Sequence, residues 1–228
     1  MMRTPASRDR LARRLSAALC LGLVTLSAWG AWHHTAGLSV WTFEGRRELQ
    51  VAAGELHAPR VAMHTAFGDD ELAWPASPTA PAAYLVDFIY TRCPSVCRTL
   101  GSQYQQMQRE LAAQARTDAA ATRVRLASIS FDVRHDGTAE LKQLAGSLHA
   151  NPAHWSFAVP ASEGDSNTLL RGLGVVAITD GEGGFVHNGD IHLLDRQGRL
   201  RALFAMDEWP LALAAASRLA AQPSEGRR

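Results

Sequence analysis

The sequence predicts an α/β fold, because buried strands and an amphipathic helix alternate along its central part. Residues 84–90 form a nearly continuous run of aromatic and branched side chains, which is typical of a strand covered on both faces. Residues 123–131 alternate like a second strand. Between them, apolar side chains recur at steps of three and four, which predicts one inward helical stripe: Cys97, Leu100, Tyr104, Met107 and Leu111. This order predicts a right-handed crossover between parallel strands.

The alternation of helices and strands continues toward the C-terminus. The expected elements are, in order, a helix capped within 136–138, a strand at 155–159, a helix at 166–173, a hairpin of 191–194 and 200–204, and a helix capped within 207–210. The hairpin follows from its turn, because Gly198 supplies the residue that tolerates a positive φ. Residues 83–221 are therefore expected to form one central sheet flanked by helices, followed by a frayed tail at 222–228.

The N-terminus has the pattern of a membrane anchor. Residues 1–14 carry five arginines against a single acid, and residues 15–32 contain no charged side chain. As a helix, this apolar run would measure about 27 Å, close to the hydrocarbon thickness of a bilayer. The positive-inside rule then holds residues 1–14 in the cytoplasm and delivers the rest of the chain across the membrane. Cys20 lies inside the apolar run and matches a lipid-attachment site poorly.

A cleaved signal peptide is the alternative interpretation of this segment. Its best cleavage site is Ala28-Trp-Gly30. The large tryptophans around that site disfavour the small side chains that cleavage requires, so we expect a retained anchor.

Residues 33–82 predict a linker and an N-terminal β-hairpin. Short strand-like runs occur at 40–43, 48–51 and 61–64, and a proline-rich connector follows at 74–81. The roughly 195 residues after the anchor suit a single domain with one core. The formal net charge is +1 and basic residues do not cluster beyond residue 14, which argues against a nucleic-acid partner.

Two cysteines follow the first buried strand directly and form the chemical centre of the sequence. If the helix starts at Cys93, then Cys93 and Cys97 share one helical face, and a helix N-terminus favours their thiolates. Two such thiols can bind a soft metal or form a disulfide, which an exported domain permits. A purely structural disulfide, or a pair of buried thiols, remains the alternative. Zinc is less suited, because no fourth Cys or His ligand is evident.

Several motifs, taken in order, resemble the Sco/SenC family over roughly residues 83–206. They are Phe88-Ile-Tyr-Thr-Arg-Cys-Pro-Ser-Val-Cys97, Ser130-Phe-Asp132, Trp155-Ser-Phe157, Leu173-Gly-Val175, and His187 ahead of Leu193-Leu-Asp-Arg-Gln-Gly198. The resemblance implies a membrane-tethered thioredoxin-like fold that binds copper, Cu(I) or Cu(II), through Cys93, Cys97 and His187. It also implies a role in assembling the dinuclear copper site of cytochrome c oxidase. Two positions depart from the family pattern, Arg98 in place of proline and Asn188 in place of serine or threonine, and neither is a ligand position.

The choice of His187 among nine histidines depends on that resemblance. By itself, His187 follows the glycine-rich segment 181–184 and has the pattern of an ordinary loop histidine. His192 is the alternative ligand, although its place in the hairpin strand favours a pairing or half-buried residue. Asp132 and His135 follow the strand next to the cysteine strand, so we expect them near the cysteines as an outer shell around the metal.

These observations predict a copper chaperone of the inner membrane with a single span and its domain in the periplasm. Its expected partner is the copper-binding subunit of the oxidase or another copper chaperone, and we expect no catalytic turnover. The alternative is a thiol-disulfide oxidoreductase that keeps the acceptor cysteines reduced with a redox-active Cys93–Cys97 pair. Against it stand the three residues between the cysteines and the lack of a proline between Pro160 and Pro210. A peroxide-reducing enzyme that uses Thr91 and Arg92 is a third, weaker hypothesis.

Overall fold

This computed structural model describes residues 5–35, 37–38, 40–67, 81–93 and 96–222. Side chains of residues 5–9, 11 and 96–100 lie outside that description. The chain divides into two units, Met1–Leu49 and Gln50–Arg228, and each is described by itself.

The first unit consists mainly of one long helix, α1 (Pro5–His34). Its segment Ala12–His34 is long and apolar enough to cross a membrane, and it includes the predicted span at 15–32. A signal sequence near an N-terminus has the same length and composition, so this helix leaves both interpretations open.

Helix α2 (Phe43–Ala53) occupies residues where the sequence pattern favoured strands. The predicted N-terminal hairpin was therefore wrong over 48–51, and residues 40–42 are also outside any strand. The physical reason is local, because Thr42 Oγ1 accepts a hydrogen bond from the backbone N–H of Gly45 at 3.0 Å and a run of good helix formers follows. Of the three expected strands, only the third forms. It is β1 (Met63–Thr65), and it pairs with a distant strand.

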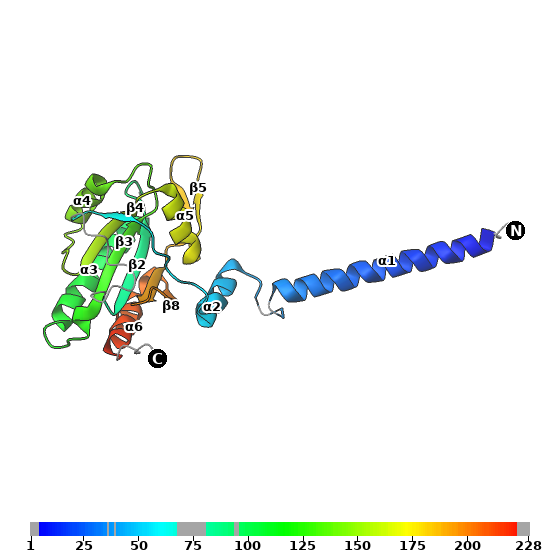
Figure 1. Cartoon of the computed structure of the whole chain (residues 1–228), viewed down its shortest axis with the longest axis horizontal. Coiled ribbons are helices and arrows are strands. Elements are labelled where there is room, and N and C mark those ends of the chain that lie inside the picture. The colour runs from blue at the N-terminus through cyan, green and yellow to red at the C-terminus, as the bar shows by residue number, and fades with distance from the viewer. Residues whose placement is uncertain (1–4, 36, 39, 68–80, 94–95, 223–228) are drawn as a thin grey trace. The chain divides into compact units, whose positions relative to one another are not determined.

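A six-stranded sheet in the order β1-β4-β3-β2-β7-β8 organises the second unit (Figure 1). Its strands besides β1 are β2 (Ala83–Ile89), β3 (Val124–Ser130), β4 (Trp155–Pro160), β7 (Ile191–Asp195) and β8 (Leu200–Phe204). Strands β2, β3 and β4 are parallel, whereas β1 and β7 run antiparallel to their neighbours. All residues of β2 are buried, as the continuous apolar run predicted.

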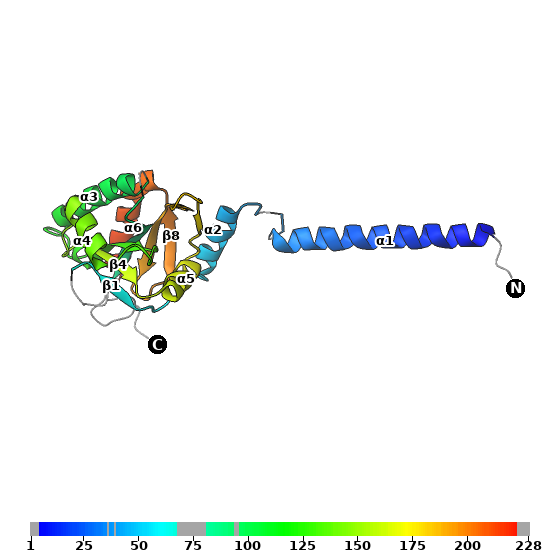
Figure 2. The same ribbon diagram turned by 90° about the horizontal axis from the view of Figure 1, so that it is seen from above.

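Helices cover both faces of this sheet (Figure 2). Buried residues of α3 (Val96–Gln114), α4 (Thr138–Ser147) and α6 (Trp209–Ala221) pack on one face. Leu169 of α5 (Glu163–Gly172) packs on the other. Helix α5 begins earlier than expected because Ser162 caps it, its Oγ accepting the backbone N–H of Asp165 at 3.1 Å. Short 3₁₀ turns at Ala121–Arg123 and Met206–Glu208 precede β3 and α6.

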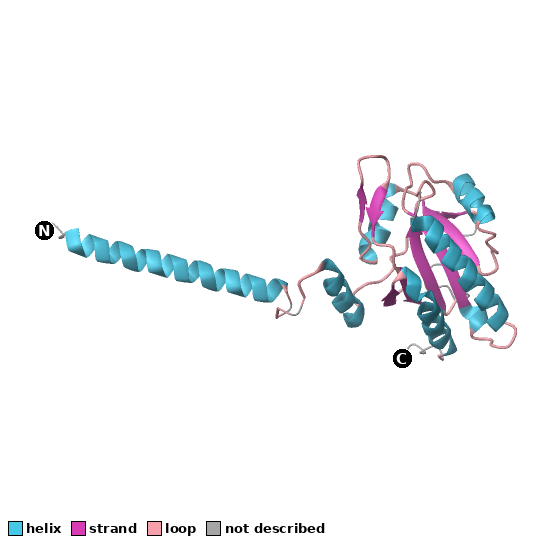
Figure 3. Cartoon of the chain, turned by 180° about the vertical axis from the view of Figure 1, so that it is seen from behind, coloured by secondary structure: helices cyan, strands magenta, loops and turns pink. Residues whose placement is uncertain are grey.

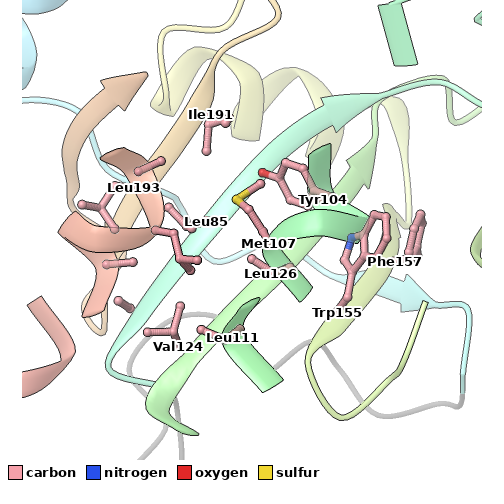
Figure 4. Packing of buried hydrophobic residues seen from close by; sticks show 14 of the residues in the cluster. Leu85, Tyr104, Met107, Leu111, Val124, Leu126, Trp155, Phe157, Ile191 and Leu193 are labelled. Atoms are coloured by element: carbon pink, nitrogen blue, oxygen red, sulfur yellow. The ribbon is translucent and has the colours of Figure 1, made fainter. Parts of the chain in front are cut away.

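The stripe of apolar residues predicted for α3 is buried wherever its side chains are described. Tyr104, Met107 and Leu111 are fully buried, and they gather with Leu126 and Trp155 of the sheet in Figure 4. The three-and-four spacing therefore identified the buried face of α3 correctly.

A second, two-stranded sheet is absent from the sequence prediction. Strands β5 (Ala177–Thr179) and β6 (Phe185–His187) pair antiparallel, apart from the main sheet (Figure 3). The expectation of a loop position for His187 was wrong, since His187 is the last residue of β6 and pairs with Ala177. Strands of three residues with glycines between them carry too little periodicity to be recognised in the sequence.

Candidate metal centre

The candidate centre lies where the parallel strands end. Cys93 lies four residues beyond the end of β2, and Asp132 lies two residues beyond the end of β3. Since β2 and β3 are parallel, both segments leave the sheet at the same edge. The prediction that Asp132 lies on the side of the cysteines is consistent with this arrangement.

Cys93 lies in a turn before the helix begins. The backbone N–H of Cys93 donates to the carbonyl of Tyr90 at 3.2 Å, and α3 starts only at Val96. The idea that Cys93 and Cys97 occupy one helical face was therefore wrong, because only Cys97 belongs to α3. The Cys93 side chain is half-buried and packs against the aromatic core on the α5 side of the sheet. The Cys97 side chain and Pro94 lie outside the described residues.

His187 enters the site from β6 and is held by aromatic neighbours. Its ring centroid lies 5.2 Å from that of Phe131 and 6.2 Å from that of Tyr90. Desolvation by these neighbours lowers the pKa of His187, which favours the neutral imidazole at pH 7. Nδ1 lies 3.2 Å from the carbonyl oxygen of Asn188, so a proton on Nδ1 donates to that carbonyl. Nε2 then keeps its lone pair, which is the form that binds a metal ion.

Cys93 and His187 line the same open hollow, which has a volume of about 590 Å³. Tyr90, Arg92 and residues 182–186 complete much of its wall. The structure thus brings together two of the three predicted ligands, from segments 94 residues apart in the chain. Within the described residues no group of three metal-ligand side chains forms, and the third predicted ligand is Cys97.

An aromatic cluster joins the two-stranded sheet to the end of β2. Tyr90 makes edge contacts with Phe185 at 5.2 Å between centroids, and Phe131 contacts Phe185 at 5.1 Å. The Tyr90 hydroxyl also lies 3.3 Å from the backbone nitrogen of Phe185, which donates to it. Sequence reasoning missed these residues as part of the site. Their only signal was that Tyr90 and Phe131 are the last residues of the two predicted strands, 84–90 and 123–131.

Asp132 is buried and contacts Arg92, the residue before Cys93. Its carboxylate accepts a hydrogen bond from Arg92 Nη2 at 2.9 Å, and His135 Nδ1 lies 2.9 Å from its other oxygen. Arg92 and His135 are about half exposed, whereas the Asp132 carboxylate is almost fully enclosed. Asp132 therefore reaches the cysteine turn through the side chain of Arg92, the residue before Cys93.

His192 is fully buried within the main sheet. It pairs with Val86 of β2, and its ring stacks edge-on against Phe88 at 5.2 Å. This placement agrees with the expectation of a strand-pairing histidine. His33, His34 and His149 are exposed.

A buried carboxyl lies in the middle of the sheet. Asp87 is 1% exposed, and the Ser128 hydroxyl donates to it at 2.6 Å while the Trp155 indole N–H donates to Ser128 Oγ at 2.9 Å. Burial raises the pKa of Asp87 to about 7. The sequence showed no signal for this group beyond a single acid within an apolar strand.

Comparison with known proteins adds to this geometry. The family model described as SCO1/SenC matches residues 77–222. The SCO1 protein homolog of Bacillus subtilis (strain 168) is 25% identical over 119 residues, which are 51% of this chain and 58% of that protein. The match thus spans less than two thirds of the relative's length.

Solved structures show the same fold at low sequence identity. ScoI of Bradyrhizobium japonicum, with copper bound, aligns with a TM-score of 0.56 and 23% identity over 72% of this chain and 99% of that one. BsSco, described as a member of the Sco family of cytochrome c oxidase assembly proteins with a disulfide switch, aligns with a TM-score of 0.60 and 16% identity over 74% of this chain and 96% of that one. These likenesses confirm the thioredoxin-like α/β fold.

Proposed function

Because this chain belongs to the SCO1/SenC family, we propose that it is a copper chaperone that assists assembly of the dinuclear copper site of cytochrome c oxidase. The solved ScoI with copper bound and the BsSco description as an oxidase assembly protein support the proposal. The proposed ligands are Cys93, Cys97 and His187. The proposed acceptor is the copper-binding subunit of the oxidase, or another copper chaperone that supplies it.

One observation carries the assignment to these residues. Cys93, after β2, and His187, in β6, line one hollow although they are distant in sequence. The imidazole suits a metal ion, because its lowered pKa leaves it neutral and its Nδ1 can be occupied by the Asn188 carbonyl. A structural disulfide alone requires no histidine at this place.

The donor atoms of the proposed site determine which metal ion it suits. Thiolates are soft ligands that favour Cu(I), and an imidazole extends the set toward Cu(II) when a further oxygen or nitrogen donor joins. Copper here is cargo, so the site has to bind it and also pass it on. An open hollow at the edge of the sheet leaves an approach for an acceptor.

The proposed location is the inner membrane, with the domain on the periplasmic side. The segment Ala12–His34 of α1 supports an anchor of suitable length, and the arginines before it support a cytoplasmic N-terminus. A reporter fused after Arg228 should be active outside the cytoplasm and stay with membranes. A soluble mature form that starts near Ala31 would contradict the anchor.

A second candidate function is thiol-disulfide exchange with the acceptor cysteines. The disulfide switch described for BsSco favours it, as does the half-buried position of Cys93 at an open edge. In this role the Cys93 and Cys97 thiols would reduce a disulfide of the acceptor and become a disulfide themselves, with two electrons and two protons passing to the acceptor.

Copper titration of the full-length chain in detergent tests the first proposal. The reduced protein should bind one equivalent of copper, and Cys93→Ala or Cys97→Ala should each abolish tight binding, because each removes one soft donor. Cys20→Ala is the matched control, since Cys20 lies in α1 and is not among the proposed ligands. Tight binding that survives loss of Cys93 or Cys97 would overturn the assignment.

A further inference from the structure

A further buried carboxyl group, that of Asp136, holds the turn that carries Cys93. Asp136 is 3% exposed, and it lies in the loop between β3 and α4. The backbone N–H of Thr91 donates to its Oδ2 at 2.8 Å, and the Thr91 hydroxyl donates to its Oδ1 at 2.5 Å. The sequence pattern placed Asp136 within a helix cap. In the structure Gly137 is the N-cap of α4, and the contact between Asp136 and Thr91 was not predicted.

Asp136 is itself fixed to the main sheet. The hydroxyl of Ser130, the last residue of β3, donates to Asp136 Oδ2 at 2.5 Å. Three donors at one buried carboxyl group, two hydroxyls and one backbone N–H, leave little freedom for any of them. Thr91 is therefore tied to the end of β3 from both its backbone and its side chain.

Other contacts also restrain the turn. Between Tyr90 and Cys93 its backbone is closed by the bond from Cys93 N–H to the Tyr90 carbonyl at 3.2 Å. The neighbouring pair of Arg92 and Asp132 depends on a side chain that is 46% exposed. The contact between Thr91 and Asp136 is a buried restraint that joins this turn to the end of β3.

We propose that Asp136 is a positioning residue of the copper site, which acts through Thr91 to hold Cys93 at the wall of the hollow opposite His187. The bonds of Asp136 run to Thr91 and Ser130, so its effect on Cys93 passes through the turn backbone. The inference rests on the copper-binding function proposed above, and it adds a residue that determines the geometry of that site. A displacement of Cys93 changes both the affinity for Cu(II) and the overlap between thiolate sulfur and metal.

The test is Asp136→Ala in the full-length chain, compared with Asp195→Ala. Asp195 is the matched control, because its buried carboxylate likewise holds a turn by hydrogen bonds: it accepts the backbone N–H groups of Gln197 and Arg199, both at 2.9 Å. It is the last residue of β7 and pairs with Ala83, at the opposite end of β2 from Cys93. Both substitutions remove comparable local bonds, but only one touches the cysteine turn.

Cu(II) affinity and the EPR and thiolate-to-copper absorption spectra are measured for each protein. Asp136→Ala should weaken Cu(II) binding by about tenfold or more and alter both spectra, whereas Asp195→Ala should keep the wild-type spectra. Thr91→Val removes only the hydroxyl contact, and a smaller change in the same direction is expected. If Asp136→Ala does not fold, the Thr91→Val variant provides the test. Wild-type affinity and spectra in the folded Asp136→Ala protein, or in Thr91→Val if that is the variant that folds, would overturn the inference.

A separate readout distinguishes this inference from the proposed function. If the wild-type chain binds no copper, the proposed function fails, and the position of Cys93 is then measured by alkylation in a Cys20→Ala, Cys97→Ala background, where Cys93 is the only thiol. Asp136→Ala should change the alkylation rate severalfold and Asp195→Ala should not. Equal rates would contradict a positioning role for Asp136.

Discussion

The two sheets of this protein differ in how firmly they are held, and the candidate centre takes one ligand from the end of each. The six-stranded sheet has a fully buried central strand, β2, and helices on both faces. The two-stranded sheet has strands of three residues and exposes Ile178 (62%) and Val186 (68%) on its outer side. An isolated hairpin of this size is marginally stable in water, so β6 depends on its contacts with the larger sheet.

Under the proposed function, this difference would allow one site both to hold and to release a metal ion. Cys93 continues from the rigid strand β2, whereas His187 is held through the aromatic contacts of Tyr90, Phe131 and Phe185. We infer that His187 is the ligand that yields more readily when copper is passed on.

The largest expected effect comes from removing the ligand on the smaller sheet. His187→Ala should weaken Cu(II) binding by more than about a hundredfold, or roughly 2.7 kcal/mol, while Cu(I) retains the two thiolates. Oxidase maturation in cells should fail with it, although the dithiol remains oxidisable. The matched variant is His192→Ala, which removes a buried histidine of the main sheet and should lower stability without removing a ligand. Full maturation of the oxidase with His187→Ala would contradict copper delivery and favour thiol reduction as the function.

The next largest effect is expected on stability, from Asp87, which is buried in β2 of the main sheet. Its pKa of about 7 lies above the ordinary value of 3.8, so the folded protein retains a proton that the unfolded chain has released. The contribution of Asp87 to the free energy of unfolding should therefore be largest at pH 4 and below. It should be lost as the pH rises through 7. Asp87→Asn cannot ionise and should exceed the wild type in unfolding free energy at pH 8 by on the order of a few kcal/mol.

Denaturant unfolding at pH 5 and pH 8 measures this difference, with Asp118→Asn as the control. Asp118 caps Ala120 N–H at 2.8 Å in the loop before β3. Parallel pH profiles for the wild type and Asp87→Asn would show that Asp87 is ionised in the folded protein at both pH values. Copper affinity measured at a single pH should be the same in the wild type and in Asp87→Asn.

A smaller effect is expected from loosening the hairpin without touching a ligand. Phe185→Ala removes the ring that contacts both Tyr90 and Phe131, and it should weaken Cu(II) binding by about tenfold with a stability loss of roughly 1–3 kcal/mol. Phe204→Ala, in β8 of the main sheet, offers a comparison with a similarly half-buried ring. Equal copper affinities in the two variants would argue that β6 is held by other contacts.

The smallest expected effect concerns one hydroxyl. Tyr90→Phe removes the acceptor of the Phe185 N–H but keeps the ring contacts, and it should cost about 0.5–1.5 kcal/mol of stability. Copper affinity should change by less than about threefold, which is under 1 kcal/mol. Isothermal titration of the variant beside Phe185→Ala separates the hydrogen bond from the ring packing. A loss as large as that of Phe185→Ala would assign the restraint to the hydroxyl.

The sequence alone was sufficient for most of the main sheet. Residues 84–90, the stripe from Tyr104 to Leu111, and the Gly198 turn correspond closely to β2, α3 and the β7–β8 hairpin. These elements follow from long periodic burial or from a backbone angle that glycine supplies, since Gly198 has φ = 81°. The membrane anchor remains a prediction from composition.

The tertiary structure determined the conformation of the short segments and the contacts between residues distant in sequence. Helix α2 formed in place of the predicted strand at 48–51, because a local cap outweighed a weak alternation of apolar residues. The start of α3 at Val96 separated Cys93 from the helix, and the β5–β6 pairing placed His187 against Tyr90 and Phe131. Residue types and spacing named Cys93, Cys97 and Asp132 as candidates, and the family resemblance added His187. Only folding could place Asp136 beneath Thr91, because that contact joins residues 45 positions apart and leaves no periodic trace in the sequence.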